Sequence, residues 1–228
     1  MVHKISSKYS ITFDDVLLSP GFSAVKPRDV VTSVKIANIT LDIPIISSAM
    51  DTVTESKMAI GMALCGALGV IHRNMSIQEQ VKEVQKIKRY KINKTASINP
   101  SLDNKGNLLV GAAVGVEKNA LQRLLKLLEV GVDVVFIDVA HAHTKTTLDF
   151  IKIAKKKLKS TPLVAGNIAT KEAAHALIKV GVDAIKVGIG PGSICTTRII
   201  TGVGVPQLSA IIDVFSVAFK YKIPVIAD

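Results

Sequence analysis

Short runs of almost purely apolar residues recur through this chain and are separated by longer amphipathic segments. Seven runs have the length of strands, and they are Pro44–Ala49, Leu68–Ile71, Gly111–Gly115, Val134–Asp138, Leu163–Asn167, Ala184–Ile189 and Pro224–Ala227. Strands that are apolar throughout are typical of a parallel sheet that is buried on both faces. The alternation therefore predicts an α/β fold built from repeated strand–helix units.

An internal repeat supports these units. The segments Val130–Asp133 and Val180–Asp183 both read Val-Gly-Val-Asp, and a predicted strand follows each one. Glycines that end helical runs, such as Gly66, Gly131 and Gly181, are typical of left-handed helix caps. No glycine-rich dinucleotide fingerprint opens the first strand–helix turn, so the pattern favours a (β/α)8 TIM barrel over a doubly wound sheet. We expect this chain to supply about seven of its strands.

Local signals predict where two helices begin and where one cysteine lies. Thr52–Glu55 and Ser76–Glu79 both fit the capping box, in which a hydroxyl and a later carboxylate satisfy free amide groups. Cys65 directly follows the apolar segment Met58–Leu64, and we expect it in the core. The polar stretch Tyr90–Asn107 predicts a flexible surface connection between the second helix and the third strand.

Composition allows one globular domain over residues 1–228 and leaves the role of its charge open. Of the 228 residues, 48% are hydrophobic, which is enough for an ordinary core. The net charge of +11 fits nucleic-acid binding, an anionic small ligand or solvated helix faces. The basic residues gather in Lys82–Lys94 and Lys152–Lys159 without interleaved aromatic residues, so we favour solvated helix faces and do not expect nucleic-acid binding. A basic surface still favours a phosphorylated substrate.

The chain shows no sign of secretion or of membrane insertion. Its two cysteines do not form a Cys-x-x-Cys pair, which argues against a disulfide framework and against structural zinc. Met1–Ile11 lacks the apolar region of a signal peptide. The longest uncharged apolar stretch, Met58–Ile71, is shorter than the roughly 18 residues of a membrane span. We therefore expect a cytoplasmic protein.

The segment from Lys186 to Arg198 is the strongest candidate for chemistry. It follows a predicted strand, and catalytic groups of barrels lie in the loops after strands. Its glycines allow a ligand to approach the backbone closely, whereas Pro191 excludes a dinucleotide fingerprint. Backbone carbonyls in such a turn can also face a monovalent cation. Cys195 is then either a small apolar filler or a nucleophile on a functional loop, and the loop favours the nucleophile.

The run from Gly190 to Gln207 closely resembles the active-site loop of the IMP dehydrogenase family. Other pieces resemble the family in the same order along the chain, and they are Thr12–Leu18, Ser47–Thr54, Ile71–Met75, Gly166–Asn167 and Val225–Asp228. The resemblance covers the chain from Thr12 to its last residue. The loop around Cys195 is highly specific, whereas each of the other pieces would be a weak signal alone.

The resemblance implies a (β/α)8 barrel, usually in a homotetramer, that oxidises IMP to xanthosine monophosphate (XMP) with NAD and is activated by potassium. Cys195 would attack C2 of the purine, with Thr197 assisting. Ser193 would hold the phosphate of IMP and Asp228 its ribose. The other implied contacts are Ser48, Met50, Asn167 and Gly192 for the nucleotide, Asp138, Gly188 and Gly190 for NAD, and the carbonyls of Gly190, Gly192 and Cys195 for potassium.

Two departures from the family pattern stand out. The family usually inserts a pair of regulatory CBS modules between the second helix and the third strand, and the connection near residues 90–107 is too short to hold them. The chain also stops at Asp228, before the eighth strand and the mobile flap. We expect these parts to belong to a longer polypeptide, and we expect residues 1–228 alone to be inactive.

Other functions remain as alternatives. GMP reductase is a sister barrel with the same cysteine loop and no CBS modules, although Val205 and the pair Ile199–Ile200 favour the dehydrogenase. Lys186 inside a strand is compatible with a Schiff-base lysine, but its place beside the cysteine loop favours a role facing the ligand. His141 and His143 form a His-x-His pair, but a metal site needs further ligands. A fragment that binds nucleic acid through its charge would show steeply salt-dependent binding.

Overall fold

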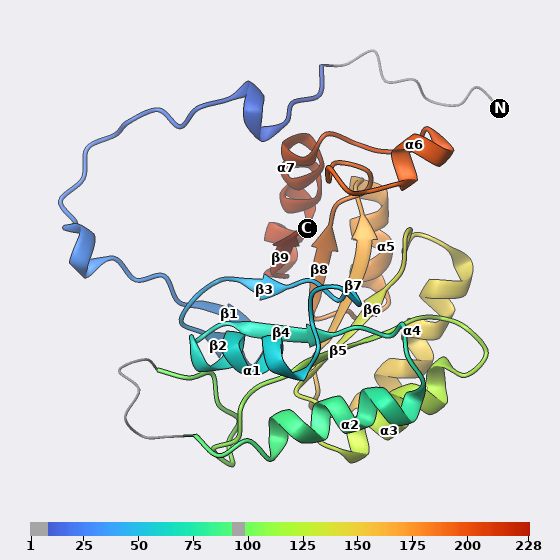
Figure 1. Ribbon diagram of the computed structural model, residues 1–228. Helices are drawn as coiled ribbons and strands as arrows, with labels where there is room; N and C mark the ends of the chain where they lie inside the picture. The colour runs from blue at the N-terminus through green and yellow to red at the C-terminus, as the bar shows by residue number, and fades with distance from the viewer. Residues whose placement is uncertain (1–8, 93–98) are drawn as a thin grey trace.

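A parallel sheet of seven strands, curled around its own axis, organises the molecule (Figure 1). The computed structural model describes residues 9–92 and 99–228. The strands follow one another in chain order, each parallel to the next. They are β3 (Ile46–Ser47), β4 (Leu68–Ile71), β5 (Gly111–Val114), β6 (Val134–Asp138), β7 (Leu163–Ile168), β8 (Ala184–Val187) and β9 (Val225–Ala227). All seven predicted strands are confirmed, and the architecture is a partial (β/α)8 barrel.

Helices cover the outer face of the sheet, as the alternation predicted. They are α1 (Ser56–Leu64), α2 (Ile77–Lys88), α3 (Ala120–Glu129), α4 (Lys145–Leu158), α5 (Lys171–Lys179) and α7 (Gln207–Ala218). The short helix α6 (Thr197–Thr201) lies in the segment between β8 and α7 and buries no residue. A small antiparallel hairpin, β1 (Val34–Ile36) with β2 (Ile39–Leu41), precedes the sheet and was not expected from the sequence. In the part of the chain that the structure describes, no helix combines the length and the apolar character needed to cross a bilayer.

The two-residue period of the strands divides the core into two layers. Alternate residues such as Val135 and Ile137 of β6 pack outward against the helices. Their neighbours Val134 and Phe136 belong to a second cluster inside the curl, which the hairpin residues Ile36, Ile39 and Leu41 also join. Since side chains of a strand alternate between faces, the next inward position of β6 is Asp138. The apolar interior therefore gives way to polar groups at the carboxyl ends of the strands.

The repeated Val-Gly-Val-Asp segments perform the same task twice. Gly131 and Gly181 end α3 and α5 with φ angles of +81° and +88°, as their positions predicted. Asp133 then accepts a hydrogen bond from the Val110 amide at 2.7 Å, and Asp183 accepts one from the Leu163 amide at 2.7 Å. Each carboxylate thus fixes the entrance of the preceding strand.

One predicted capping box is confirmed and the other is wrong. Ser76 and Glu79 exchange hydrogen bonds at the start of α2. The helix near Thr52, by contrast, begins only at Ser56, and its N-cap residue Glu55 makes no capping hydrogen bond. The buried Thr54 instead donates to the carbonyl of Ser48 at 2.6 Å, because the chain first needs a turn to leave the sheet edge.

The prediction for Cys65 is also wrong, because its side chain is exposed. The helix α1 buries Ala59 and Ala63, and Cys65 follows its last residue on the solvent side. Gly66 has a φ of +82° and turns the chain toward β4, which confirms the predicted cap.

The connection near residues 90–107 is anchored where the structure describes it. Residues 93–98 of this predicted surface connection lie outside the described ranges. In the described part, the ammonium of Lys88 on α2 lies 3.0 Å from the carboxylate of Asp103 and 2.6 Å from that of Asp133. Burial alone would raise the pKa of Asp103, but donors on Asn107, Lys88 and Lys105 lower it to about 2. Residues 99–107 are therefore not the flexible loop that their polarity predicted.

Close packing of β4 against α1 gives a test of this fold. A Cβ added at Gly69 would lie 2.4 Å from the Ala59 Cα, whereas a Cβ added at Gly61 on the same helix meets nothing within 4 Å. We expect Gly69→Ala to lower the free energy of unfolding by about 1–3 kcal/mol through overpacking. Gly61→Ala should be neutral or stabilise by up to about 1 kcal/mol. Urea unfolding of both variants measures the difference, and equal stabilities would contradict the described packing.

Candidate active site

The loop between β8 and α6 holds Cys195 in a compact glycine turn. The Cys195 amide donates to the Gly192 carbonyl at 3.1 Å. Gly190 adopts a φ of +81°, and a Cβ there would lie 2.9 Å from the Gly204 Cα. Only glycine fits this position without displacing the returning chain. The turn thus fixes the backbone on which the thiol is carried.

Donors around the thiol favour its ionised form. The side chain and the amide of Thr197 hydrogen-bond the Cys195 sulfur, as do the amides of Gly190 and Arg198, and together they lower the pKa of the thiol. The Cys195 side chain is half-buried, so it is still open to a ligand. A thiol with a lowered pKa and an open face is a candidate nucleophile.

A cavity of about 260 Å³ lies in front of Cys195. Its wall brings together seven of the residues that the sequence singled out, and these are Asp138, Asn167, Gly188, Gly190, Cys195, Thr197 and Asp228. They come from the carboxyl ends of β6, β7, β8 and β9, which parallel pairing aligns, and from the segment between β8 and α6. The position fits the active face of a barrel.

Asn167 and Gln207 tie the strand ends together. The side-chain amide of Asn167 donates to the Gly188 carbonyl and to the Asp228 carboxylate, both at 2.6 Å. The buried Gln207 amide donates to the carbonyls of Val187 and Asp228, both at 2.9 Å. A Cβ at Gly188 would lie 2.6 Å from the Asp228 carbonyl, so glycine permits this approach. Gln207 ends the run that resembles the family's active-site loop, and nothing in the sequence indicated this structural role.

A second cavity of about 200 Å³ adjoins the first and contains Ser48. Ser47 and Ser48 line it from β3, and Asp138, Lys186 and Asp228 line both cavities. Met50, Gly192 and Ser193 line neither of them. Met50 instead accepts the amides of Val53 and Thr54 in the turn before α1.

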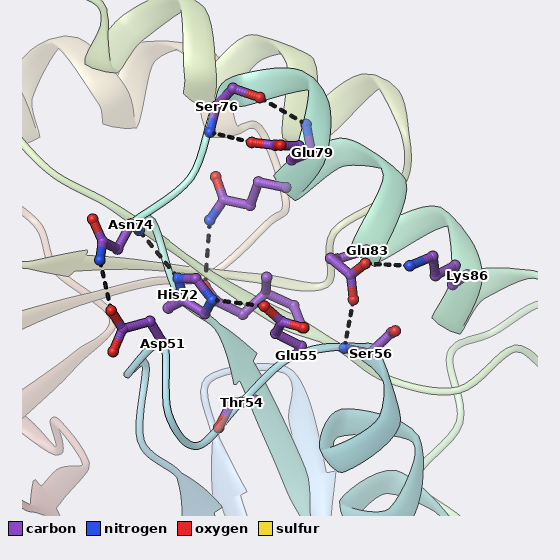
Figure 2. A network of polar contacts seen from close by, with 12 residues as sticks. Asp51, Thr54, Glu55, Ser56, His72, Asn74, Ser76, Glu79, Glu83 and Lys86 are labelled. Carbon is purple, nitrogen blue, oxygen red and sulfur yellow. Dashed lines mark hydrogen bonds and ion pairs between the residues drawn. The ribbon is translucent and has the colours of Figure 1, made fainter.

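Two loops at this face are tied to each other by a polar network (Figure 2). The backbone amide of Asn74 donates to Nδ1 of the buried His72 at 3.1 Å. Because Nδ1 accepts this bond, the ring proton is on Nε2, which lies 3.4 Å from Glu55 Oε1. Asn74 also donates to the Asp51 carboxylate at 2.6 Å. The loop that carries Ser48 is therefore joined to the loop that carries Arg73.

Arg73 was not assigned a role from the sequence, although it lies in the quoted run Ile71–Met75. Its guanidinium donates to the Asp138 carbonyl at 3.3 Å and lies 3.7 Å from the Glu117 carboxylate. It lines the same cavity as Cys195. Its place after the end of β4 was the signal that pointed to it.

The histidine pair offers no complete metal site. The rings of His141 and His143 meet edge to face with their centroids 6.2 Å apart. Over residues 9–92 and 99–228, no three His, Cys, Asp or Glu side chains gather as metal ligands.

A larger cavity of about 670 Å³ lies between the hairpin, β3, α7 and β9, away from Cys195. Its lining is mostly apolar and includes Ile46, Phe215 and Val225.

Comparisons with known proteins agree on one family. The family model of the IMP dehydrogenase / GMP reductase domain matches residues 10–228. The chain is 44% identical to inosine-5'-monophosphate dehydrogenase of Borreliella burgdorferi, aligned over 100% of this chain and 65% of that protein. It is 46% identical to the enzyme of that name from Cryptosporidium parvum, over 96% of this chain and 61% of that protein. It is 37% identical to the Staphylococcus aureus protein of that name, over 97% of this chain and 68% of that protein.

The chain thus spans 61% to 68% of the length of these curated relatives.

The lowered pKa of Cys195 gives a direct test of the loop. The thiolate is the reactive form, so alkylation by iodoacetamide should accelerate as pH rises through the thiol pKa. Thr197→Val removes the hydroxyl, which contributes most to the lowering. We expect the midpoint of the pH profile of alkylation to lie at higher pH in this variant. Each unit by which the pKa of the thiol rises lowers the thiolate fraction at neutral pH about tenfold.

The alkylation rates are measured by mass spectrometry in a Cys65→Ser background, where Cys195 is the only cysteine. Thr197→Ser is the matched control because it retains the hydroxyl. Identical pH profiles for Thr197→Val and Thr197→Ser would contradict the role of that group.

Proposed function

Because the chain belongs to the IMP dehydrogenase / GMP reductase family, we propose that it forms the catalytic barrel of an NAD-dependent IMP dehydrogenase. The observation that carries the proposal is Cys195, an open thiol of lowered pKa on the loop after β8. It faces a cavity whose other walls are Asp138, Asn167 and Asp228. Relatives named as IMP dehydrogenases align with nearly the whole chain, which supports the dehydrogenase over the reductase.

In the proposed reaction the Cys195 thiolate attacks C2 of the purine of IMP. A bond between sulfur and C2 forms, and C2 loses a hydride, for which NAD is the acceptor. Water then attacks C2 of the resulting thioimidate, and the bond to sulfur breaks. One proton of the water passes to the adjacent ring nitrogen and the other to solvent, so that XMP leaves with the thiolate restored. A covalent intermediate divides one difficult substitution into two easier steps. The donors on Thr197 hold the sulfur in its reactive state between turnovers.

The other side chains bind and orient the two substrates. In this proposal Asp228 binds the ribose of IMP, and Ser193 its phosphate. Ser48, Met50, Asn167 and Gly192 complete the nucleotide site. NAD contacts Asp138, Gly188 and Gly190, which line the Cys195 cavity.

We also propose a potassium ion in the same turn. We assign the ion to the carbonyls of Gly190, Gly192 and Cys195, since backbone oxygens suit a weakly hydrated monovalent cation. The Gly192 carbonyl already accepts the Cys195 amide, and a carbonyl has a second lone pair for a ligand. An ion there would brace the turn that carries the thiol.

We further propose that residues 1–228 act as one catalytic domain without an inserted regulatory module, in a homotetramer in the cytoplasm. The absence of further described elements between α2 and β5 supports the first point, and the need for a reduced thiol at Cys195 supports the cytoplasm.

The decisive experiment is a rapid acid quench of the full-length protein with IMP and NAD, followed by peptide mass spectrometry. We expect a purine nucleotide adduct on Cys195 and formation of NADH. Cys195→Ala should lose both, with turnover lower by several orders of magnitude, as is usual when a nucleophile is removed. Cys65→Ser is the matched control and should keep full activity, because Cys65 lies outside both cavities.

Two other outcomes would correct the proposal. Consumption of NADPH with GMP, and no reaction with IMP, would identify a GMP reductase. No adduct with either nucleotide would leave Cys195 without a catalytic role.

A further inference from the structure

Lys186 lies at the centre of the polar groups that end the apolar interior of the sheet. Its ammonium is 2.8 Å from Asp228 Oδ2 and 3.3 Å from Asp138 Oδ1. It also donates to Asn167 Oδ1 at 3.1 Å. An ammonium has three protons, so these three acceptors match its whole donor capacity. The residue therefore links the ends of β6, β7 and β9 from its own position on β8.

The fold holds the Lys186 stem in place. Lys186 is on the inward-facing row of β8, two residues after Ala184 of the interior cluster. A Cβ at Gly166 would lie only 2.6 Å from the Lys186 Cβ, so the neighbouring strand leaves room for the stem only because glycine stands there. The side chain is 15% exposed, which restricts its ammonium to the partners described. Its partners also argue against the Schiff-base alternative, since a free amine is the reactive form.

Lys186 and its two carboxylate partners form the wall that the two cavities share. Asp138, Lys186 and Asp228 are the only residues that line both the Cys195 cavity and the Ser48 cavity, over the described part of the chain. Two carboxylates that approach one point repel each other unless a cation lies between them. Removal of the ammonium would leave a partly buried like-charged pair free to move apart.

We infer that Lys186 is a positioning residue that sets the separation of Asp138 and Asp228 and so aligns the two substrates. This rests on the proposed function, in which Asp228 binds the ribose of IMP and Asp138 contacts NAD. Lys186 makes no contact with the reacting atoms. It acts through the two carboxylates. Its loss therefore weakens the binding of both substrates, although IMP and NAD contact different residues.

The test is a double-mutant cycle in the full-length protein. Lys186→Met keeps the length of the stem and removes the charge, whereas Lys186→Arg keeps the charge. Lys155→Met is the matched control, because Lys155 forms an ion pair at 2.7 Å with Asp183, which directly precedes β8 at the opposite end of the strand from the Cys195 loop. The dissociation constant of IMP is measured by calorimetry without NAD, and KM for NAD is measured by steady-state kinetics.

We expect Lys186→Met to raise both constants by about tenfold, since it leaves partly buried charges unpaired. Lys186→Arg should restore both to within about threefold. In an Asp228→Asn background, the effect of Lys186→Met on IMP binding should shrink to less than about twofold, because the partner is gone. Lys155→Met should change neither constant.

Equal effects of Lys186→Met in the two backgrounds, or no rescue by arginine, would overturn the inference. If Lys186→Met fails to fold, as judged by circular dichroism, Lys186→Gln takes its place in the same cycle. If the protein proves to reduce GMP, the dehydrogenase proposal fails and the cycle is run with GMP, which has the same ribose. Coupling between Lys186 and Asp228 there would support the positioning role, and additivity would overturn it.

Discussion

Parallel pairing brings the carboxyl ends of seven strands to one edge of the sheet, and the candidate site depends on this alignment. Within each strand the two-residue period then decides which side chains face inward. The row that runs through Val134 and Phe136 ends in Asp138, and the row through Ala184 continues to Lys186. One geometric rule thus produces both the apolar interior and the polar layer above it.

The cysteine loop adds chemistry to this frame. Cys195 is not on a strand, and its position depends on a turn that glycine permits at residue 190. The donors that lower the pKa of the thiol come from the same short segment, including Thr197 and Arg198. The loop can therefore hold a reactive sulfur by local contacts, while the strand ends supply groups that bind substrates.

The two ends of the sheet have different tasks. At the amino ends, Asp133 and Asp183 fix strand entrances, and Lys88 anchors the connection to β5. These partly buried interactions stabilise the fold and lie at the opposite end of the strands from the Cys195 loop. At the carboxyl ends, the network around His72 instead joins two loops whose neighbours line the cavities (Figure 2). This separation allows loops to vary in function on a constant frame.

The sequence by itself determined the strand–helix order, the seven strands, the caps at Gly131 and Gly181, and the loop around Cys195. Each is a local signal, written in periodicity or in a short run of residues. It did not determine that Cys65 is exposed or that Thr54 binds the Ser48 carbonyl instead of belonging to a helix cap. Nor did it show that Lys186 lies between Asp138 and Asp228, 48 and 42 residues away in the chain. Only the tertiary structure decided these contacts, because a local pattern in the sequence does not specify which side chains of different strands and loops meet in space.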